Sequence, residues 1–289
     1  MIFNNSEVVF LRGFPRSGTN WVCKLLNLHP EIKCSGEFHL QVLYKSFEEF
    51  KKFNGSCVVS NKETLAALEI DFNSLILKTI AGKIGNYKII CDRTPQPLST
   101  MLIPDSKYIR ITRDGRDNLV SWFYHTMRIA SPVVLKQYPA MKEKAVLLHN
   151  NKDYFELNPK ELLSCEAFFR QTAKHWNHYI LSDNEICSKF DQGFRNISYF
   201  HIEYETLHAE TEKIRNELYS FLNVEPVLAK GLSNDTMPGF KKHDALSHNR
   251  KGEVGGWQKY FNDTYAKWFD EEASEGLKLL NYGLTQSIT

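Results

Sequence analysis

The chain has 289 residues, of which 42% are hydrophobic and 24% are charged, a composition typical of a globular protein with a substantial core. Its 36 Lys and Arg residues nearly balance 34 Asp and Glu residues, and the net charge of +2 argues against nucleic acid as a partner. Any anion site must therefore come from a few placed cations rather than from a global field.

The cysteines and the apolar runs further narrow the class of protein to which the chain can belong. The six cysteines form no Cys-x-x-Cys pair and no zinc-type spacing, which is typical of free thiols in a reducing compartment and predicts no metal site. No apolar run approaches membrane-spanning length, and residues 1–7 lack the basic start and apolar core of a signal peptide. We therefore expect a cytoplasmic protein with no membrane partner, whose oligomeric state stays open.

The first predicted unit along the chain is a strand, a glycine-bearing loop and a helix. Residues 8–11 (Val-Val-Phe-Leu) suit a buried strand, Gly13 and Pro15 interrupt it, and residues 21–28 carry apolar side chains at helical spacing. Such a loop offers backbone N–H groups and a helix N-terminus to an anion, which is the usual way in which proteins hold phosphate. A strand–turn–helix without a ligand is the plainer alternative.

The loop differs from the P-loop of nucleoside-triphosphate enzymes. Gly13 and Gly18 have the P-loop spacing, but Thr19 and Asn20 occupy the places of its Lys and of its Ser or Thr. The cation instead lies inside the loop as Arg16. ATP or GTP hydrolysis is therefore the weaker interpretation.

Strands and helices alternate along the rest of the chain. We expect strands at residues 32–34, 87–91, 108–112 and 197–204, and helices at residues 117–127, 165–181, 211–222 and 260–280. This alternation predicts an α/β fold, a P-loop-like central parallel β-sheet flanked by helices on both faces. Residues 40–81 are expected to be helical pieces, residues 131–160 a surface excursion or lid, and residues 231–256 a basic loop. No linker divides these parts, so residues 1–289 are expected to form a single domain.

A second anion-binding pattern follows the strand expected at residues 108–112. Arg113 comes directly after that strand and Ser121 lies in the next helix, so a guanidinium and a hydroxyl could hold a dianionic phosphate together. Arg113 could instead pair with nearby carboxylates on the surface, an arrangement worth little. We favour the phosphate site for Arg113 and Ser121 and leave Arg116 undecided. Further on, residues 250–257 (Arg-Lys-Gly-Glu-Val-Gly-Gly-Trp) form a third, basic turn.

Together the three segments resemble those of the sulfotransferases that use 3′-phosphoadenosine-5′-phosphosulfate (PAPS) and release 3′-phosphoadenosine-5′-phosphate (PAP). The resemblance extends over about residues 8–280 and implies no metal. It implies that the first loop binds the 5′-phosphosulfate through Arg16, Ser17, Gly18, Thr19 and Asn20. It implies that the 3′-phosphate is held by Arg113, Ser121, Arg250, Lys251 and Gly252, and that the nucleotide is flanked by Trp21, Tyr204 and Phe240. For these three aromatic residues, core packing is the alternative.

The resemblance also indicates how an acceptor would lose its proton. Cytosolic sulfotransferases use a His in a Lys-Thr-His-x-Pro segment, but the matching residues 91–95 are Cys-Asp-Arg-Thr-Pro. Arg93 replaces the His, and an Arg is always protonated and cannot be a base. Protein-tyrosine sulfotransferases instead use a Glu shortly after a His-Pro-Asp/Glu turn, and residues 29–37 resemble that segment. Glu37 is therefore the implied general base, with a surface carboxylate paired to a Lys as its alternative.

The remaining roles follow from this assignment. Arg93 would stabilise the sulfuryl group and Arg16 the leaving group. His39 is the reserve base, because its unperturbed pKa of about 6.5 suits proton transfer. Asp92 is the third candidate, and His125 is expected near the acceptor pocket.

The activity implied by the resemblance is in-line sulfuryl transfer from PAPS to a hydroxyl or amine of a small-molecule acceptor, with a natural product as the leading class. A carbohydrate hydroxyl and a peptide tyrosine are alternatives within the same chemistry. A P-loop nucleotide kinase would require Mg²⁺ and a nucleoside triphosphate. A non-catalytic nucleotide-binding module would bind PAP without turnover.

Overall fold

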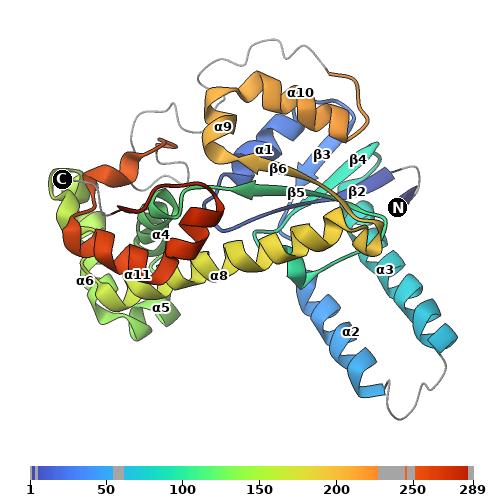
Figure 1. Cartoon of the computed structure of the whole chain (residues 1–289), viewed down its shortest axis with the longest axis horizontal. Helices are drawn as coiled ribbons and strands as arrows, with labels where there is room; N and C mark the ends of the chain where they lie inside the picture. The colour runs from blue at the N-terminus through green and yellow to red at the C-terminus, as the bar shows by residue number, and fades with distance from the viewer. Residues whose placement is uncertain (1, 4–5, 55–61, 227–244, 246–250, 286–289) are drawn as a thin grey trace.

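The computed structural model describes residues 2–3, 6–54, 62–226, 245 and 251–285. Within these residues, a six-stranded sheet forms the centre of the molecule (Figure 1). Its strands are β1 (Ile2–Phe3), β2 (Ser6–Gly13), β3 (Ile32–Ser35), β4 (Ile89–Arg93), β5 (Lys107–Thr112) and β6 (Ser198–Glu203). Five of them run parallel in the order β3-β4-β2-β5-β6, and the short β1 pairs antiparallel with β2. The expected parallel α/β sheet is therefore confirmed.

β2 lies at the centre of the sheet because its sequence suits burial on both faces. Val8, Val9, Phe10 and Leu11 are all fully buried, as is typical of a central parallel strand. Side chains alternate across a strand, so Val8 and Phe10 face one layer of helices, whereas Val9 and Leu11 face the other. The register places Phe10 beside Tyr108 of β5, where the two rings stack 4.9 Å apart.

Helices cover both faces of the sheet. On one face lie α1 (Thr19–Leu26), α9 (Tyr204–Ala209) and α10 (Thr211–Phe221), which pack with Val9 and Leu11. On the other face lie α2 (Gln41–Asn54), α3 (Lys62–Ile84) and α8 (Glu166–Asp191), which pack with Val8 and Phe10. Beyond the sheet, α2 and α3 extend away from the body of the molecule (Figure 1), and their Phe47 and Phe72 rings stack 4.0 Å apart.

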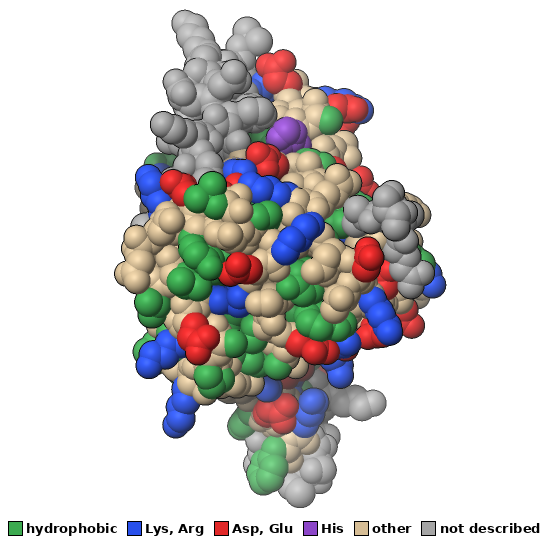
Figure 2. Space-filling view, turned by 90° about the vertical axis from the view of Figure 1, so that its left-hand side faces the viewer, with side chains coloured by type: hydrophobic (Ala, Val, Ile, Leu, Met, Phe, Trp, Pro, Cys, Tyr) green, Lys and Arg blue, Asp and Glu red, His purple; other side chains and the backbone are tan. Residues whose placement is uncertain are grey.

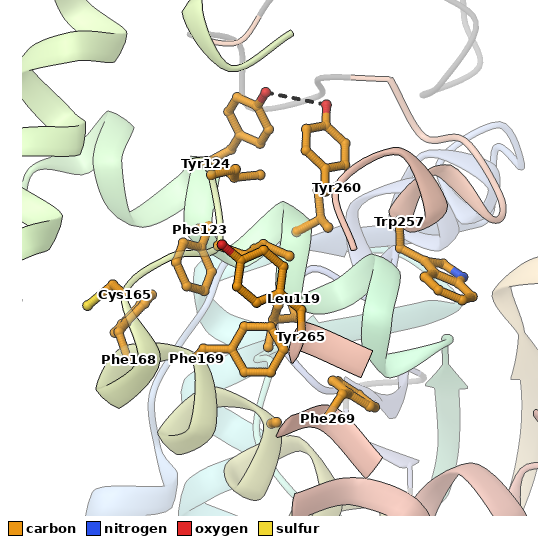
Figure 3. Close-up of a cluster of buried hydrophobic side chains, with 14 of the residues drawn as sticks. Leu119, Phe123, Tyr124, Cys165, Phe168, Phe169, Trp257, Tyr260, Tyr265 and Phe269 are labelled. Carbon is orange, nitrogen blue, oxygen red and sulfur yellow. Dashed lines mark hydrogen bonds between the residues drawn. The ribbon is translucent and has the colours of Figure 1, made fainter. Parts of the chain in front are cut away.

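A separate helical core adjoins α4 (Gly115–Ile129), the helix that follows β5. It is completed by α5 (Pro132–Gln137), α6 (Pro139–Asn150), α7 (Tyr154–Leu157), α11 (Asp263–Leu279) and the 3-10 turn η4 (Gly256–Lys259). Further 3-10 turns are η1 (Leu98–Thr100), η2 (Pro159–Glu161) and η3 (Phe194–Asn196). Aromatic side chains dominate this core (Figure 3), where the Phe169 ring of α8 packs against Tyr265 and Phe269 of α11. The hydroxyls of Tyr124 and Tyr260 are 3.4 Å apart.

The expectation of a surface excursion or lid at residues 131–160 is wrong. The segment folds into α5, α6 and α7, and Met141, Leu148 and Phe155 are fully buried. Met141 and Leu148 are two helical turns apart, so they lie on one face of α6, which packs against α4. The prolines that interrupt the apolar pattern begin α5 and α6, where a missing backbone N–H costs nothing.

The surface of the described residues carries both signs of charge. On the face shown in Figure 2, Lys and Arg side chains are interspersed with Asp and Glu side chains. This pattern agrees with the net charge of +2. Among the helices of the described ranges, none combines the length and the apolar character needed to cross a membrane.

Candidate active site

The first element of the site is the loop between β2 and α1. The Ser17 N–H donates to Phe14 O at 3.0 Å and the Trp21 N–H donates to Gly18 O at 2.8 Å, so the loop turns tightly into the helix. Gly18 has a φ of 102°, and a Cβ there would lie 2.6 Å from Tyr204 Cδ2. Only glycine fits this position. The N–H groups at the start of α1 therefore form the kind of anion site that a strand–loop–helix unit offers.

Arg113 is the centre of the second element. Its buried guanidinium donates to Glu253 O at 2.7 Å and to Arg16 O at 3.3 Å, and it lies 4.2 Å from the centre of the Tyr204 ring. Arg16 Nε in turn donates to Ser121 Oγ at 3.2 Å. The first loop and the arginine–serine pattern, about a hundred residues apart in sequence, are therefore in direct contact.

The described part of the basic C-terminal turn is held at the same place. Tyr204 Oη donates to Gly252 O at 2.7 Å, and the Asp117 carboxylate accepts the Gly255 N–H at 2.8 Å and the Trp257 N–H at 2.9 Å. Burial raises the pKa of Asp117 to about 6, against the lowering effect of a nearby guanidinium and these two N–H groups. Side chains of α9 and α4 thus fix the backbone of the turn.

These segments surround one cavity of about 600 Å³, a size typical of ligand sites. The expected site residues on its wall are Arg16, Gly18, Thr19, Asn20, Trp21, Glu37, Arg93, Arg113, Ser121, Tyr204, Lys251 and Gly252. Ser17 is fully buried behind the loop, where its Oγ accepts from Asn118 Nδ2 at 3.0 Å. Phe240 and Arg250 lie outside the described residues.

Positive charge predominates in the described wall. The cations are Arg16, Arg93, Arg113, Arg128 and Lys251, and the carboxylates are Glu37, Asp117 and Glu253. Arg113 Nε is buried and has no hydrogen-bond partner among the described residues. A wall of this kind suits a ligand that carries several negative charges.

Glu37 lies on the cavity wall, with its side chain 36% exposed. Arg93 Nη1 is 3.4 Å from Glu37 Oε1 and also donates to Asn20 Oδ1, so it links the carboxylate to the first loop. His39 Nε2 is 3.6 Å from Glu37 Oε2, but its side chain is 55% exposed and does not line the cavity. The carboxylate is therefore better placed for chemistry in the cavity than the imidazole.

The structure excludes Asp92, the third candidate base. Its side chain is 2% exposed, and its Oδ2 is 2.8 Å from Arg12 Nη2 in a buried ion pair. Its Oδ1 accepts from Thr94 Oγ1 at 2.8 Å. Both oxygens are occupied and neither reaches the cavity, because β2 and β4 are neighbours and bring Arg12 beside Asp92.

Trp21, assigned to the nucleotide with core packing as the alternative, and Arg116, left undecided, lie in different environments. Trp21 is almost fully buried and its ring meets Tyr204 edge-on at 5.4 Å, yet it also contributes to the cavity wall. Arg116 does not line the cavity. It forms a buried ion pair with Asp114 at 2.7 Å, and its guanidinium lies 4.1 Å from the centre of the Trp257 ring. Arg116 therefore stabilises the start of α4 rather than a ligand.

Side chains of α4, namely Trp122, His125, Arg128 and Ile129, form one wall of the cavity. Of these, Trp122, Arg128 and Ile129 were not among the expected site residues. These residues lie three and four apart, so they share a helix face with Ser121, and that spacing was the available signal. His125, expected near the acceptor pocket, lines the cavity together with Arg128, whose Nη2 is 3.0 Å from His125 Nδ1.

Within the described ranges, no group of three or more His, Cys, Asp or Glu side chains is arranged to hold a metal ion.

Comparison with known proteins identifies the family of the chain. A family model for the sulfotransferase domain matches residues 6–281. Protein-tyrosine sulfotransferase 2 of Gallus gallus is 27% identical over 136 residues, which are 43% of this chain and 35% of that protein. A putative protein-tyrosine sulfotransferase of Caenorhabditis briggsae is 30% identical over 122 residues, 40% of this chain and 42% of that protein. The matches span well under half the length of these relatives.

A solved structure shares the fold. The crystal structure of mouse sulfotransferase SULT7A1 complexed with PAP aligns with a TM-score of 0.55 and 20% sequence identity. The alignment covers 96% of this chain and 87% of that chain.

Proposed function

Because the chain belongs to the sulfotransferase-domain family, we propose that it transfers a sulfuryl group from PAPS to a hydroxyl or amine of a small-molecule acceptor. The observation that carries this proposal is the contact between the two anion-binding motifs, in which Arg16 Nε donates to Ser121 Oγ at 3.2 Å on the wall of one cavity. A single donor with phosphate groups at two positions can therefore reach both motifs.

The residues present fit such a donor. Arg113 Nε is buried without a hydrogen-bond partner among the described residues, so it has a donor to offer to an oxygen of the 3′-phosphate. Arg16, Gly18 and Thr19 would hold the 5′-phosphosulfate, and Lys251 adds a further cation. Bound PAPS supplies the sulfuryl group and a phosphate leaving group.

The protein's own groups account for the rest of the reaction. Arg16 stabilises the negative charge that grows on the leaving oxygen, and loss of one such donor typically costs about 100- to 1,000-fold in rate. Arg93 holds Glu37 at 3.4 Å and faces the cavity, where it can also stabilise the transferred group. Glu37 takes the proton of the acceptor as general base. His39 is the reserve base.

The acceptor is a small molecule in this proposal, with a natural product as the leading class. A carbohydrate or a peptide tyrosine is the alternative, and the second of these is supported by the names of the curated relatives. We further propose that residues 1–289 act as one domain in the cytoplasm. A P-loop kinase is disfavoured because Thr19 occupies the place of the P-loop Lys.

Calorimetry with PAP and with ATP, each with and without Mg²⁺, tests the donor. We expect PAP to bind more tightly than ATP and independently of Mg²⁺, whereas Mg²⁺-dependent ATP binding would favour the kinase.

A screen of hydroxyl- and amine-bearing metabolites, sugars and tyrosine peptides with PAPS, read by the mass gain of one sulfate, tests the transfer and identifies the acceptor. PAP binding without turnover of any acceptor would favour the non-catalytic module.

A further inference from the structure

Three cysteines lie side by side on the α1 face of the sheet, next to the cavity and outside its wall. Cys34 of β3 and Cys91 of β4 are partners in the parallel register. Cys23 Sγ of α1 donates to the backbone oxygen of Cys34 at 3.4 Å. Cys34 and Cys91 are buried, whereas Cys23 is only partly buried. A reagent from solvent therefore meets Cys23 first and finds Cys34 directly behind it.

Cys23 is surrounded by groups that favour its ionised form. Asn27 Nδ2 lies 3.6 Å from Cys23 Sγ, and the side chains of Arg93 and Lys33 add positive charge. Cys34 is the largest influence on the pKa of Cys23, and with these groups it lowers that pKa to about 7, against the opposing effect of burial. A lowered pKa increases the share of Cys23 present as thiolate near neutral pH, and the thiolate is the reactive form.

We propose that Cys23 and Cys34 form an oxidation site for oxidants of the peroxide class. The Cys23 thiolate attacks a peroxide oxygen, so that an S–O bond forms, the O–O bond breaks and hydroxide leaves. The sulfur is oxidised to a sulfenic acid and the peroxide is reduced. The Cys34 sulfur then attacks the Cys23 sulfur, the S–O bond breaks, and the Cys34 proton leaves with the hydroxyl as water. The product is a disulfide between α1 and β3.

This disulfide acts on the cavity through the elements that it joins, and this part of the inference rests on the proposed function. α1 begins at the first loop, and β3 ends two residues before Glu37. In a disulfide the two sulfur atoms are about 2.05 Å apart, closer than two thiols that are not bonded, so α1 and β3 must approach each other. Oxidation also removes a negatively charged neighbour of Arg93. Since a displacement of about 1 Å can cost about 100-fold in rate, we expect a loss of about 10- to 100-fold.

Peptide mapping after mild hydrogen peroxide tests the site itself. Cys57 lies outside the described residues, so the experiment uses a Cys57→Ser background. Cleavage after Lys and Arg separates Cys23 (residues 17–24) from Cys34 (residues 34–45), and a disulfide joins these two peptides. We expect the joined peptides to form with peroxide and to separate with dithiothreitol.

Cysteine-to-serine variants test which thiol is oxidised first and which one completes the disulfide. Cys34→Ser should leave a sulfenic acid at Cys23 that dimedone traps, and Cys23→Ser should prevent the cross-link. Cys187→Ser is the matched control, because Cys187 is buried away from the other described cysteines and burial raises its pKa. It should leave the cross-link unchanged. The proposal is overturned if Cys23 is oxidised no faster than Cys187, or if oxidised Cys23 does not join Cys34.

Activity measurements test separately whether the disulfide affects sulfuryl transfer. In the Cys57→Ser background, peroxide should lower sulfuryl transfer about 10- to 100-fold and dithiothreitol should restore it. The Cys23→Ser variant should keep its activity in peroxide. A cross-link that forms without loss of transfer would refute the coupling. If the reduced protein transfers no sulfuryl group at all, the proposed function fails while the mapped cross-link stands.

Discussion

Substitution of Arg113 by Ala is the sharpest perturbation of the donor site. The guanidinium is buried and donates to Glu253 O at 2.7 Å and to Arg16 O at 3.3 Å, while its Nε has no hydrogen-bond partner among the described residues. A hydrogen bond to a charged group contributes about 1.5–3 kcal/mol. Because about 1.4 kcal/mol is a factor of ten, loss of the contact with the 3′-phosphate alone should weaken PAP about 10- to 150-fold.

Calorimetry with PAP and with 5′-AMP separates this contact from general damage. 5′-AMP lacks the 3′-phosphate, so its affinity should change far less than that of PAP in Arg113→Ala. Arg113→Lys keeps the charge and loses the bidentate geometry, so an intermediate loss is expected. Arg170→Ala is the control, because Arg170 of α8 pairs at the surface with Glu166 of α8 and Glu271 of α11, and its loss should leave both ligands unaffected. Equal losses for PAP and 5′-AMP would show that Arg113 does not contact the 3′-phosphate.

Three further predictions test the base, the buried ion pair and a buried carboxyl. Glu37→Gln should lower kcat about 100- to 10,000-fold with little change in PAP affinity. Glu31→Gln is the control, because the Glu31 side chain is exposed, and it should have no effect. Near-parental turnover of Glu37→Gln would rule out Glu37 as the base. Asp92→Asn leaves the buried Arg12 guanidinium without its charge partner and should lower the free energy of unfolding by about 3–5 kcal/mol in a denaturant titration. A loss below about 1 kcal/mol would contradict the burial of the pair. Burial raises the pKa of Asp183 to about 7, so the folded protein binds this proton more tightly than the unfolded chain. The associated stability is fully present below about pH 4 and is lost as the pH rises through about 7; Asp183→Asn should flatten this dependence, and an unchanged profile would count against the raised pKa.

The anion-binding motifs could be predicted because each depends on a short stretch of chain. A buried strand, a glycine turn and a helix start leave their pattern within about fifteen residues, as at residues 8–21. Arg113 and Ser121 lie eight positions apart, close enough for one strand end and the next helix to present both. The parallel sheet followed from the alternation of strands and helices.

Segments that pack over long distances could not be predicted in the same way. Residues 131–160 looked like a surface excursion or lid, because exposed apolar residues such as Val146 and Leu147 obscure the buried positions of α6, which are recognised only once α4 lies against them. Trp122 and Arg128 of α4 were missed because nothing in the sequence shows that this helix face lines a cavity until the first loop is placed opposite it.

The order of residues by itself determined where phosphate groups can be held, since backbone turns and helix starts are built from neighbours in the chain. The tertiary structure decided which charged side chains are free to act. Asp92 and Glu37 are both carboxylates near the ends of strands, but Arg12 from the adjacent strand buries and neutralises Asp92, while Glu37 stays on the cavity wall. Burial and ion pairing depend on partners that only folding brings together, and these partners determine the chemistry of each group.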